Sequence, residues 1–167
     1  MNIFLGIDNG LTGAIAAIGP DGALLGVWDA PVREYGSERV LDGTAVWDIL
    51  AQFDPDTTVV VQEAAQLNPQ FGAKGNYRNG DSHGRTATAV ELWVRSSKGR
   101  HHLIDPAQWQ RPILRQIRGA GLNTKGASIE FCRRMWPDAG IEKDGHADAL
   151  CLAEWGRRMT LSGRASV

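Results

Sequence analysis

The stretch NIFLGIDNGLTGAIAAIGPDGALLGVW, residues 2–28, decides the fold because it holds three short apolar runs separated by turn-forming residues. The runs cover residues 2–7, 12–18 and 23–28. Asp, Asn, Gly and Pro dominate the gaps between them, and these residue types favour tight turns. The spacing predicts three short strands joined by tight turns, an antiparallel meander.

The rest of the chain alternates between helix and strand patterns. Residues 57–62 form a β-branched run of the kind found in a strand buried on both faces, and residues 101–104 form a further expected strand. The remaining patterns are typical of helices, at residues 44–53, 85–94, 106–117, 128–135 and 146–159. Strands first, then strands alternating with helices, predict an α/β fold with a mixed sheet.

Residues 64–84 interrupt this alternation. They contain four glycines and three asparagines and show no usable periodicity. We therefore expect a long, mobile, glycine-rich loop, which is usually functional when it interrupts a compact domain. We expect residues 161–167 to be a disordered tail. A length of 167 residues predicts that residues 1–167 form a single domain.

Composition excludes several classes of protein. No apolar run approaches the roughly 20 residues needed to cross a bilayer, so a membrane-spanning protein and a membrane partner are excluded. The first residues reach a charge at Asp8 too early for a secretory signal, which favours a cytoplasmic chain. That chain would act in a bacterial or phage-infected cell, or in an organelle after removal of a transit peptide. Cys132 and Cys151 are far apart and are interpreted as free thiols.

The net charge of −1 conceals a strong asymmetry. Residues 1–63 hold 2 basic and 10 acidic residues (−8), residues 64–134 hold 12 and 4 (+8), and residues 135–167 hold 4 and 5 (−1). A basic middle segment indicates phosphate binding, although a solvated helix face is the plainer alternative. The candidate phosphate-binding residues are Lys74, Arg78, Arg85, Arg111, Arg115, Arg118 and Lys125.

Two aromatic residues lie in the glycine-rich segment. Phe71 and Tyr77 are expected to be exposed, where an aromatic ring can stack on or wedge between bases at a branch point. A ring that folds back onto its own domain is the alternative for each.

Two acidic residues stand at the ends of expected strands. Asp8 follows the first apolar run directly, where an Asp that starts a turn is the plain interpretation. Glu63 ends the β-branched run at a place where a buried strand would otherwise continue.

Asp144 and Asp148 are spaced i, i+4, which places them on one face of a helix beside apolar residues. Helix capping explains Asp144 but not Asp148, which lies a turn inside the helix. Together with Asp8 and Glu63 they would form an oxygen-rich site whose repulsion a hard cation, Mg²⁺ or Mn²⁺, would remove. Two such ions roughly 4 Å apart can activate water for phosphodiester hydrolysis.

Three segments in order, GIDNGLTGA (6–14), VVVQE (59–63) and KDGHADAL (143–150), resemble the active-site segments of RuvC-like Holliday-junction resolvases, which belong to the RNase H-like superfamily. The segments PAQW (106–109) and TKGAS (124–128) are similar to phage-type and chloroplast-type members. The resemblance implies an RNase H-like fold: a central mixed five-stranded sheet, with its first three strands antiparallel, flanked by helices.

The resemblance also implies a function. Asp8, Glu63 and Asp148 match the metal-binding, catalytic carboxylates of the family, which act with Mg²⁺ or Mn²⁺, two ions per site. The fourth ligand matches Asp144 in the phage and chloroplast branch; His146 is the alternative, but a spacing of two residues on a helix points it away from Asp148. The implied activity is that of a homodimeric endonuclease that resolves four-way DNA junctions in recombination and repair.

Two other functions compete with this one. A structure-specific branched-DNA-binding protein without efficient catalysis would keep the same surface while a changed neighbouring residue silences the site. A small ATPase-like protein of the actin or sugar-kinase type would share the Asp-x-Gly-x-Thr-Gly pattern after the first strand. Such proteins need two domains and a second glycine-rich phosphate loop, which 167 residues do not provide.

Overall fold

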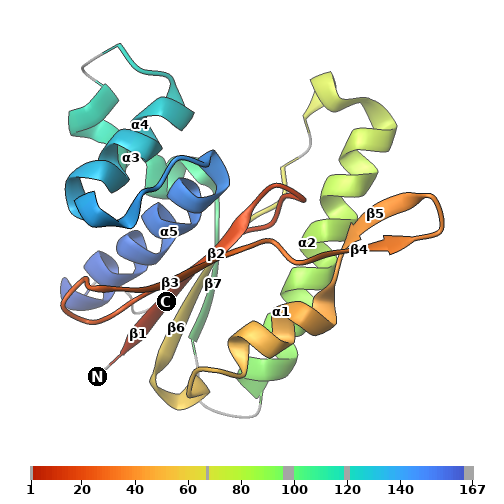
Figure 1. The fold of residues 1–167 in the computed structure, drawn as a ribbon, viewed down its shortest axis with the longest axis horizontal. Helices are drawn as coiled ribbons and strands as arrows, with labels where there is room; N and C mark the ends of the chain where they lie inside the picture. Colours follow the sequence, from red (N-terminus) through yellow and green to blue (C-terminus); the bar gives the residue numbers. More distant parts are fainter. Residues whose placement is uncertain (1, 67, 96–99, 119–120, 164–167) are drawn as a thin grey trace.

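A five-stranded mixed sheet forms the centre of the computed structural model, which describes residues 2–66, 68–95, 100–118 and 121–163 (Figure 1). Its strand order is β3-β2-β1-β6-β7. The strands are β1 (Ile3–Asp8), β2 (Ala14–Ile18), β3 (Leu24–Asp29), β6 (Thr58–Glu63) and β7 (Arg100–Ile104). The pairs β1–β2 and β2–β3 are antiparallel, whereas the pairs β1–β6 and β6–β7 are parallel. The α/β class, the mixed sheet and the antiparallel first three strands are thus confirmed.

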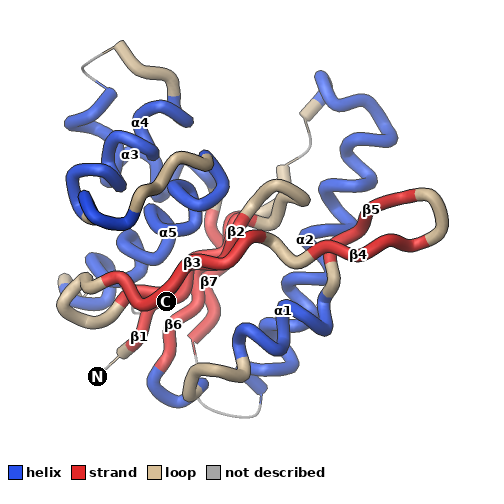
Figure 2. The backbone as a smooth tube through the Cα atoms, in the orientation of Figure 1, coloured by secondary structure: helices blue, strands red, loops and turns tan. Residues whose placement is uncertain are grey.

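Helices cover both faces of this sheet (Figure 2). On one face lie α3 (Pro106–Arg118), α4 (Thr124–Met135) and α5 (Asp144–Leu161). On the other lie α1 (Gly43–Leu50) and α2 (Gly72–Arg95), together with a two-stranded hairpin of β4 (Val32–Tyr35) and β5 (Glu38–Leu41). Short 3-10 turns occur at Pro55–Thr57, Pro69–Phe71 and Pro137–Ala139. No helix in the described part of the chain is long and apolar enough to span a membrane.

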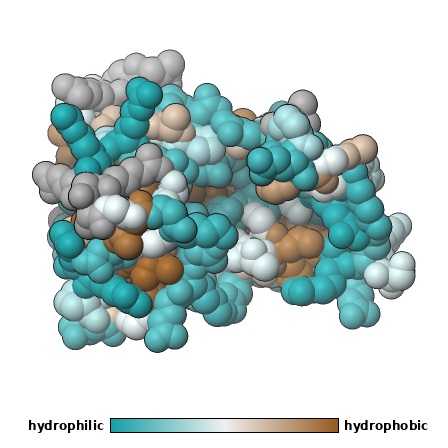
Figure 3. All heavy atoms as spheres, turned by 90° about the horizontal axis from the view of Figure 1, so that it is seen from above, coloured by the Kyte–Doolittle hydropathy of each residue, from teal (hydrophilic) through white to brown (hydrophobic). Residues whose placement is uncertain are grey.

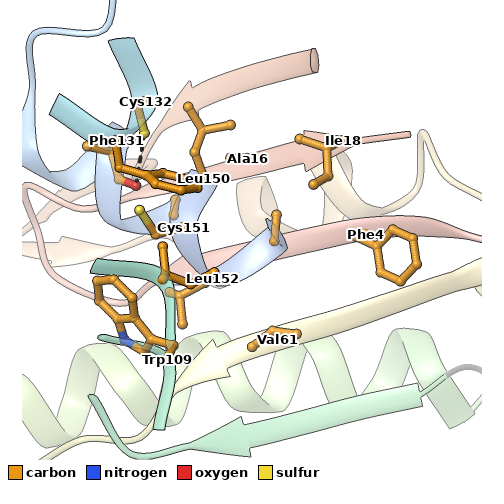
Figure 4. Packing of buried hydrophobic residues seen from close by; sticks show 14 of the residues in the cluster. Phe4, Ala16, Ile18, Val61, Trp109, Phe131, Cys132, Leu150, Cys151 and Leu152 are labelled. Atoms are coloured by element: carbon orange, nitrogen blue, oxygen red, sulfur yellow. Dashed lines mark hydrogen bonds between the residues drawn. The ribbon is translucent and has the colours of Figure 1, made fainter. Parts of the chain in front are cut away.

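The two faces of the sheet belong to two separate apolar clusters because side chains alternate along each strand. Phe4 of β1 and Val61 of β6 pack with residues of α3, α4 and α5, as Figure 4 shows. Leu5 of β1 and Val60 of β6 face the opposite way and pack with residues of α1 and α2. Burial on both faces explains why these strands are almost continuously apolar.

Two glycines let α5 touch the sheet with its backbone. A Cβ atom on Gly6 would lie 1.9 Å from the main-chain oxygen of Ala149 in α5. A Cβ atom on Gly145, near the start of α5, would lie 2.4 Å from the main-chain oxygen of Thr12. Both distances are far shorter than a van der Waals contact, so only glycine fits at either place.

The prediction of a loop over residues 64–84 is wrong for its second half, because Gly72–Arg95 is one helix of 24 residues. The buried residues of α2 begin only at Ser82, so its first turns are exposed and lack the apolar spacing that marks a helix. Asparagines fix this end of the helix to the preceding segment. The Asn76 side chain donates to the Asn68 carbonyl (3.0 Å), and that of Asn79 donates to the Gln66 carbonyl (3.1 Å).

The expected tail over residues 161–167 is corrected in part. Leu161 is the last residue of α5, and Ser162 closes the helix by donating its backbone N–H to the Arg158 carbonyl (3.0 Å). Residues 164–167 lie outside the described residues.

Candidate active site

The four acidic residues that the sequence singles out lie at the edge of the sheet where β1 and β6 end. Asp8 is the last residue of β1 and Glu63 the last of β6, and these strands are parallel neighbours, so both carboxylates lie at the same edge. Helix α5 begins at Asp144 and carries Asp148 one turn later, where it packs against β1. Asp148 feels the charges of the other three, Asp8 feels that of Asp144, and Glu63 feels that of Asp8. The structure therefore brings all four together.

Burial shifts the acid strength of three of these groups. It raises the pKa of Asp148 to about 7, although a hydrogen bond from Ser128 opposes the shift and the neighbouring acids add to it. It raises the pKa of Glu63 to about 6 against a hydrogen bond from Trp109. It also raises the pKa of Asp8, which the backbone N–H of Gly10 opposes. These carboxylates are held in surroundings that disfavour their negative charge.

Asp144 is different because it has a cationic partner. Lys125, at the start of α4, makes an ion pair with it, and this hydrogen bond lowers the pKa of Asp144. The pair is exposed to solvent. Lys125 also lies close enough to Asp8 and Asp148 for their charges to raise its own pKa, so this predicted DNA-binding lysine stands inside the acidic site.

His146, the alternative to Asp144 as fourth ligand, is directed elsewhere. Its Nε2 atom lies 2.6 Å from a carboxylate oxygen of Asp29, at the end of β3. Lys143 donates to both oxygens of the same carboxylate, at 2.7 and 2.8 Å. Asp144 accordingly faces the acidic site, while Lys143 and His146 bind Asp29.

The acidic residues fit a hard divalent cation by their chemistry. The Oδ1 atom of Asp148 is closed off from solvent and has no hydrogen-bond partner among the described residues. Carboxylate oxygens are the ligands that Mg²⁺ and Mn²⁺ prefer, and a cation would relieve both the raised pKa values and the unsatisfied oxygen. No group of three or more His, Cys, Asp or Glu side chains in the described ranges is already arranged around a metal-sized position.

A cleft of about 360 Å³ opens beside the strand ends. Its walls include Asp8, Glu63 and Phe71, whose ring is 57% exposed. Phe71 closes the short turn before α2, so the structure places this predicted aromatic next to two of the acids. Tyr77 lies further along α2 and is also exposed.

Apart from Lys125, the predicted basic residues divide between two helices, α2 and α3, on opposite sides of the sheet edge (Figure 1). On α2, Lys74 and Arg78 form ion pairs with Glu38 of the hairpin, at 3.2 and 2.8 Å, and Arg85 pairs with Asp81 at 2.8 Å. On α3, Arg111 and Arg115 are exposed, and Arg118 is the last residue of the helix, its side chain outside the described residues. The surface seen from above is largely hydrophilic, with apolar side chains gathered in two separate places (Figure 3).

Trp109 is a site residue to which no sequence pattern assigned a role. Its ring is fully buried in the cluster beneath α5 (Figure 4), yet its Nε1 atom donates to the Glu63 carboxylate at 2.7 Å. Asn9, Gln62 and His101, which form a polar chain behind Glu63, were also missed. The one available signal was that Gln62, within an apolar strand, and Asn9, directly after one, are polar residues next to the acids.

Comparison with known proteins shows the fold. No protein-family model matches the sequence, and no curated protein does. Among solved structures, RuvC of T. thermophilus in complex with a Holliday junction substrate matches with a TM-score of 0.67 and 16% identity, covering 98% of each chain. A second Thermus thermophilus RuvC structure matches with a TM-score of 0.60 and 17% identity, covering 96% of each chain. The chain therefore has the RNase H-like fold seen in RuvC, over almost its whole length.

Proposed function

We propose that this chain is a metal-dependent endonuclease that resolves four-way DNA junctions. The observation that carries the proposal is the edge where β1, β6 and α5 meet: Asp8, Glu63 and Asp148 have raised pKa values there, and one oxygen of Asp148 lacks a partner among the described residues. Such an arrangement is costly for the fold alone. It is useful if a divalent cation completes it.

The four acids would hold Mg²⁺ or Mn²⁺, two ions per site. Bound there, such ions would supply activation of water and neutralisation of charge on the leaving oxygen in phosphodiester hydrolysis. The chain's own contribution is to hold Glu63 in place through Trp109 and to keep Lys125 beside Asp144. With Asp144 serving as a ligand, the Lys125 ammonium would be available to contact the phosphate.

Branched DNA is the proposed substrate. The basic residues of α2 and α3 lie on either side of the acids, so duplex arms on both helices would bring the branch point over the site. Phe71 on the wall of the cleft can stack on a base exposed at the branch. A homodimer would place two sites on one junction and yield paired nicks. The RuvC structure solved with a Holliday junction has the same fold, which favours this substrate over a nucleotide and the ATPase-like alternative.

The deciding experiment compares a labelled four-way junction with a linear duplex of matched sequence in Mg²⁺. We expect paired nicks near the branch by the wild type, and a loss of about a thousandfold or more, roughly 4 kcal/mol, in Asp8→Asn. Asp48→Asn, which changes an exposed acid on α1, is the matched control and should cleave normally.

Equal rates on junction and linear duplex would contradict the proposed substrate. Full activity of Asp8→Asn would contradict the proposed site. Tight junction binding by the wild type without any cleavage would favour the branched-DNA-binding protein instead.

A further inference from the structure

A network of buried polar side chains, formed by Asn9, Gln62 and His101, links β1 and β6 beyond the point where the pairing of these strands ends. The parallel register of β1 and β6 runs from Ile3 opposite Thr58 to Ile7 opposite Gln62. After Asp8 the chain turns away into a tight turn, in which the Gly13 N–H donates to the Gly10 carbonyl (2.8 Å). The side-chain amide of Asn9 donates to the main-chain carbonyl of Glu63. Asn9 thereby replaces the strand contact that the turn removes.

Two further side chains extend this contact across the sheet. The Gln62 amide nitrogen donates to the Asn9 side-chain oxygen at 2.7 Å. His101 of β7 approaches the Gln62 side-chain oxygen with its Nε2 atom at 2.9 Å. Gln62 is fully buried and Asn9 is 5% exposed, so water cannot replace these bonds at low cost.

The main-chain carbonyl of Glu63 determines which group donates and which accepts in each hydrogen bond of this polar network. A carbonyl only accepts, so Asn9 must turn its NH₂ group toward Glu63 and its oxygen toward Gln62. Gln62 must then present its NH₂ group to Asn9 and its oxygen to His101. Burial lowers the pKa of His101. The neutral ring must therefore carry its single proton on Nε2.

Glu63 is in this way held from both faces of the sheet. Gln62 points to the same side as Val60, which packs with α1 and α2. The Glu63 side chain points to the opposite side, where Trp109 donates to its carboxylate. The main chain of Glu63 is fixed from one face and its carboxylate from the other.

We propose that Asn9, Gln62 and His101 are positioning residues that set the separation of Asp8 and Glu63 for a divalent cation. The inference deepens the proposed function, since it rests on these acids binding metal. Partners of metal ligands typically change metal affinity by about 10- to 100-fold when they are mutated.

The test measures Mn²⁺ affinity by titration calorimetry together with the melting temperature. Gln62→Met keeps the volume of the side chain and removes both of its hydrogen bonds, and we expect it to weaken Mn²⁺ binding about 10- to 100-fold. His101→Leu removes the donor at the far end of the chain, whereas His101→Gln keeps an N–H group at a similar reach. His101→Gln should therefore bind Mn²⁺ like the wild type and His101→Leu should not.

Trp136→Phe is the matched control. It removes one partly buried hydrogen bond, from Trp136 Nε1 to the Gly22 carbonyl at 2.8 Å, which ties the end of α4 to the turn between β2 and β3. We expect it to lower the melting temperature and leave Mn²⁺ affinity unchanged. An equal loss of Mn²⁺ affinity in Trp136→Phe would mean that the polar network acts only through overall stability, and would overturn the proposal.

Three more results would overturn it: normal Mn²⁺ affinity in Gln62→Met, equal weakening in His101→Leu and His101→Gln, or a neutral His101 that NMR shows protonated on Nδ1. A wild type that binds no Mn²⁺ would do so as well. Junction cleavage is scored separately, because a wild type that binds Mn²⁺ without cutting DNA contradicts only the proposed function.

Discussion

Helix α5 carries two carboxylates that the fold treats in opposite ways. Glu154 is fully buried, yet it accepts hydrogen bonds from Arg157 at 2.7 and 2.9 Å and from Arg158 at 2.7 Å. Burial acts to raise its pKa, but these bonds outweigh it and the pKa is lowered. Asp148, nearly two turns earlier, has an enclosed oxygen without a partner among the described residues and a pKa raised to about 7.

The helix itself explains the difference. The arginines stand three and four residues after Glu154, where side chains on a helix meet. The residues at the same spacing after Asp148 are Cys151 and Leu152, which carry no positive charge and are fully buried. The fold supplies cations where a carboxylate serves packing. It supplies no cationic side chain at the same spacing after Asp148.

The largest expected effect comes from neutralising Asp148. Asp148→Asn should reduce junction cleavage by about a thousandfold or more, roughly 4 kcal/mol, because a proposed ligand is lost. In EDTA the same variant should melt at a higher temperature than the wild type, since a buried charge without a cation is removed. Cleavage assays and thermal melts check both halves. A variant that cleaves junctions normally, or that melts at a lower temperature than the wild type in EDTA, would contradict the different roles assigned to Asp148 and Glu154.

Glu154→Leu should have the opposite effects: lower stability and unchanged cleavage activity. Breaking a buried ion pair from one side leaves arginines uncompensated, so we expect the free energy of unfolding to fall by about 2 to 4 kcal/mol, less than for a fully enclosed pair because both arginines are partly exposed. Urea denaturation measures the loss, with the exposed Glu142→Gln as control. Specific activity per folded molecule should stay near that of the wild type. A stable variant with impaired cleavage would reverse the assignment.

The stability contributions of the acids at the sheet edge and of Glu154 should also respond to pH in opposite ways in EDTA. Asp148 and Glu63, with pKa values of about 7 and about 6, hold protons in the folded state that the unfolded chain has released. Their effect is to favour unfolding as pH rises from about 4 to 7, by about 1 to 3 kcal/mol after allowing for partial exposure. Glu154 has a lowered pKa, so its stabilising contribution is present above the usual pKa and is lost as pH falls through the folded-state value.

Melting temperatures from pH 4.5 to 8 test the effect of Asp148 and Glu63, and melts below pH 4.5 test that of Glu154. Asp148→Asn, or saturating Mn²⁺ with the wild type, should flatten the decline toward pH 7. A wild type whose stability rises steadily from pH 4.5 to 8 in EDTA would show that the fold does not disfavour the ionised forms of Asp148 and Glu63.

Lys125→Gln should have the smallest effect. Its ion pair with Asp144 is exposed, with 71% and 38% of the two side chains accessible, so the free energy of unfolding should change by less than about 1 kcal/mol. Urea denaturation beside Glu154→Leu gives the comparison. A loss as large as that of Glu154→Leu would mean that Lys125 already serves as the structural cation of the site.

Local patterns explain what could be predicted from the sequence. The apolar runs, their glycine turns and the acids at the strand ends all lie within a few residues of one another, so the meander and the positions of Asp8 and Glu63 follow from the sequence. The first half of α2 could not be recognised, because an exposed helix carries no apolar stripe. The bonds of Gln62 to Asn9 and His101 join residues 53 and 39 positions apart. They depend on the register of neighbouring strands, which local patterns do not determine.

The close approach of α5 at Gly6 and Gly145 has a consequence for how the sequence can change over time. Main chain rests on main chain there, so the gap between the strand that carries Asp8 and the helix that carries Asp148 does not depend on the size of any core side chain. Mutational drift in the apolar clusters should leave that gap unaltered. A single added methyl at Gly6, an inconspicuous change on paper, would widen it at once.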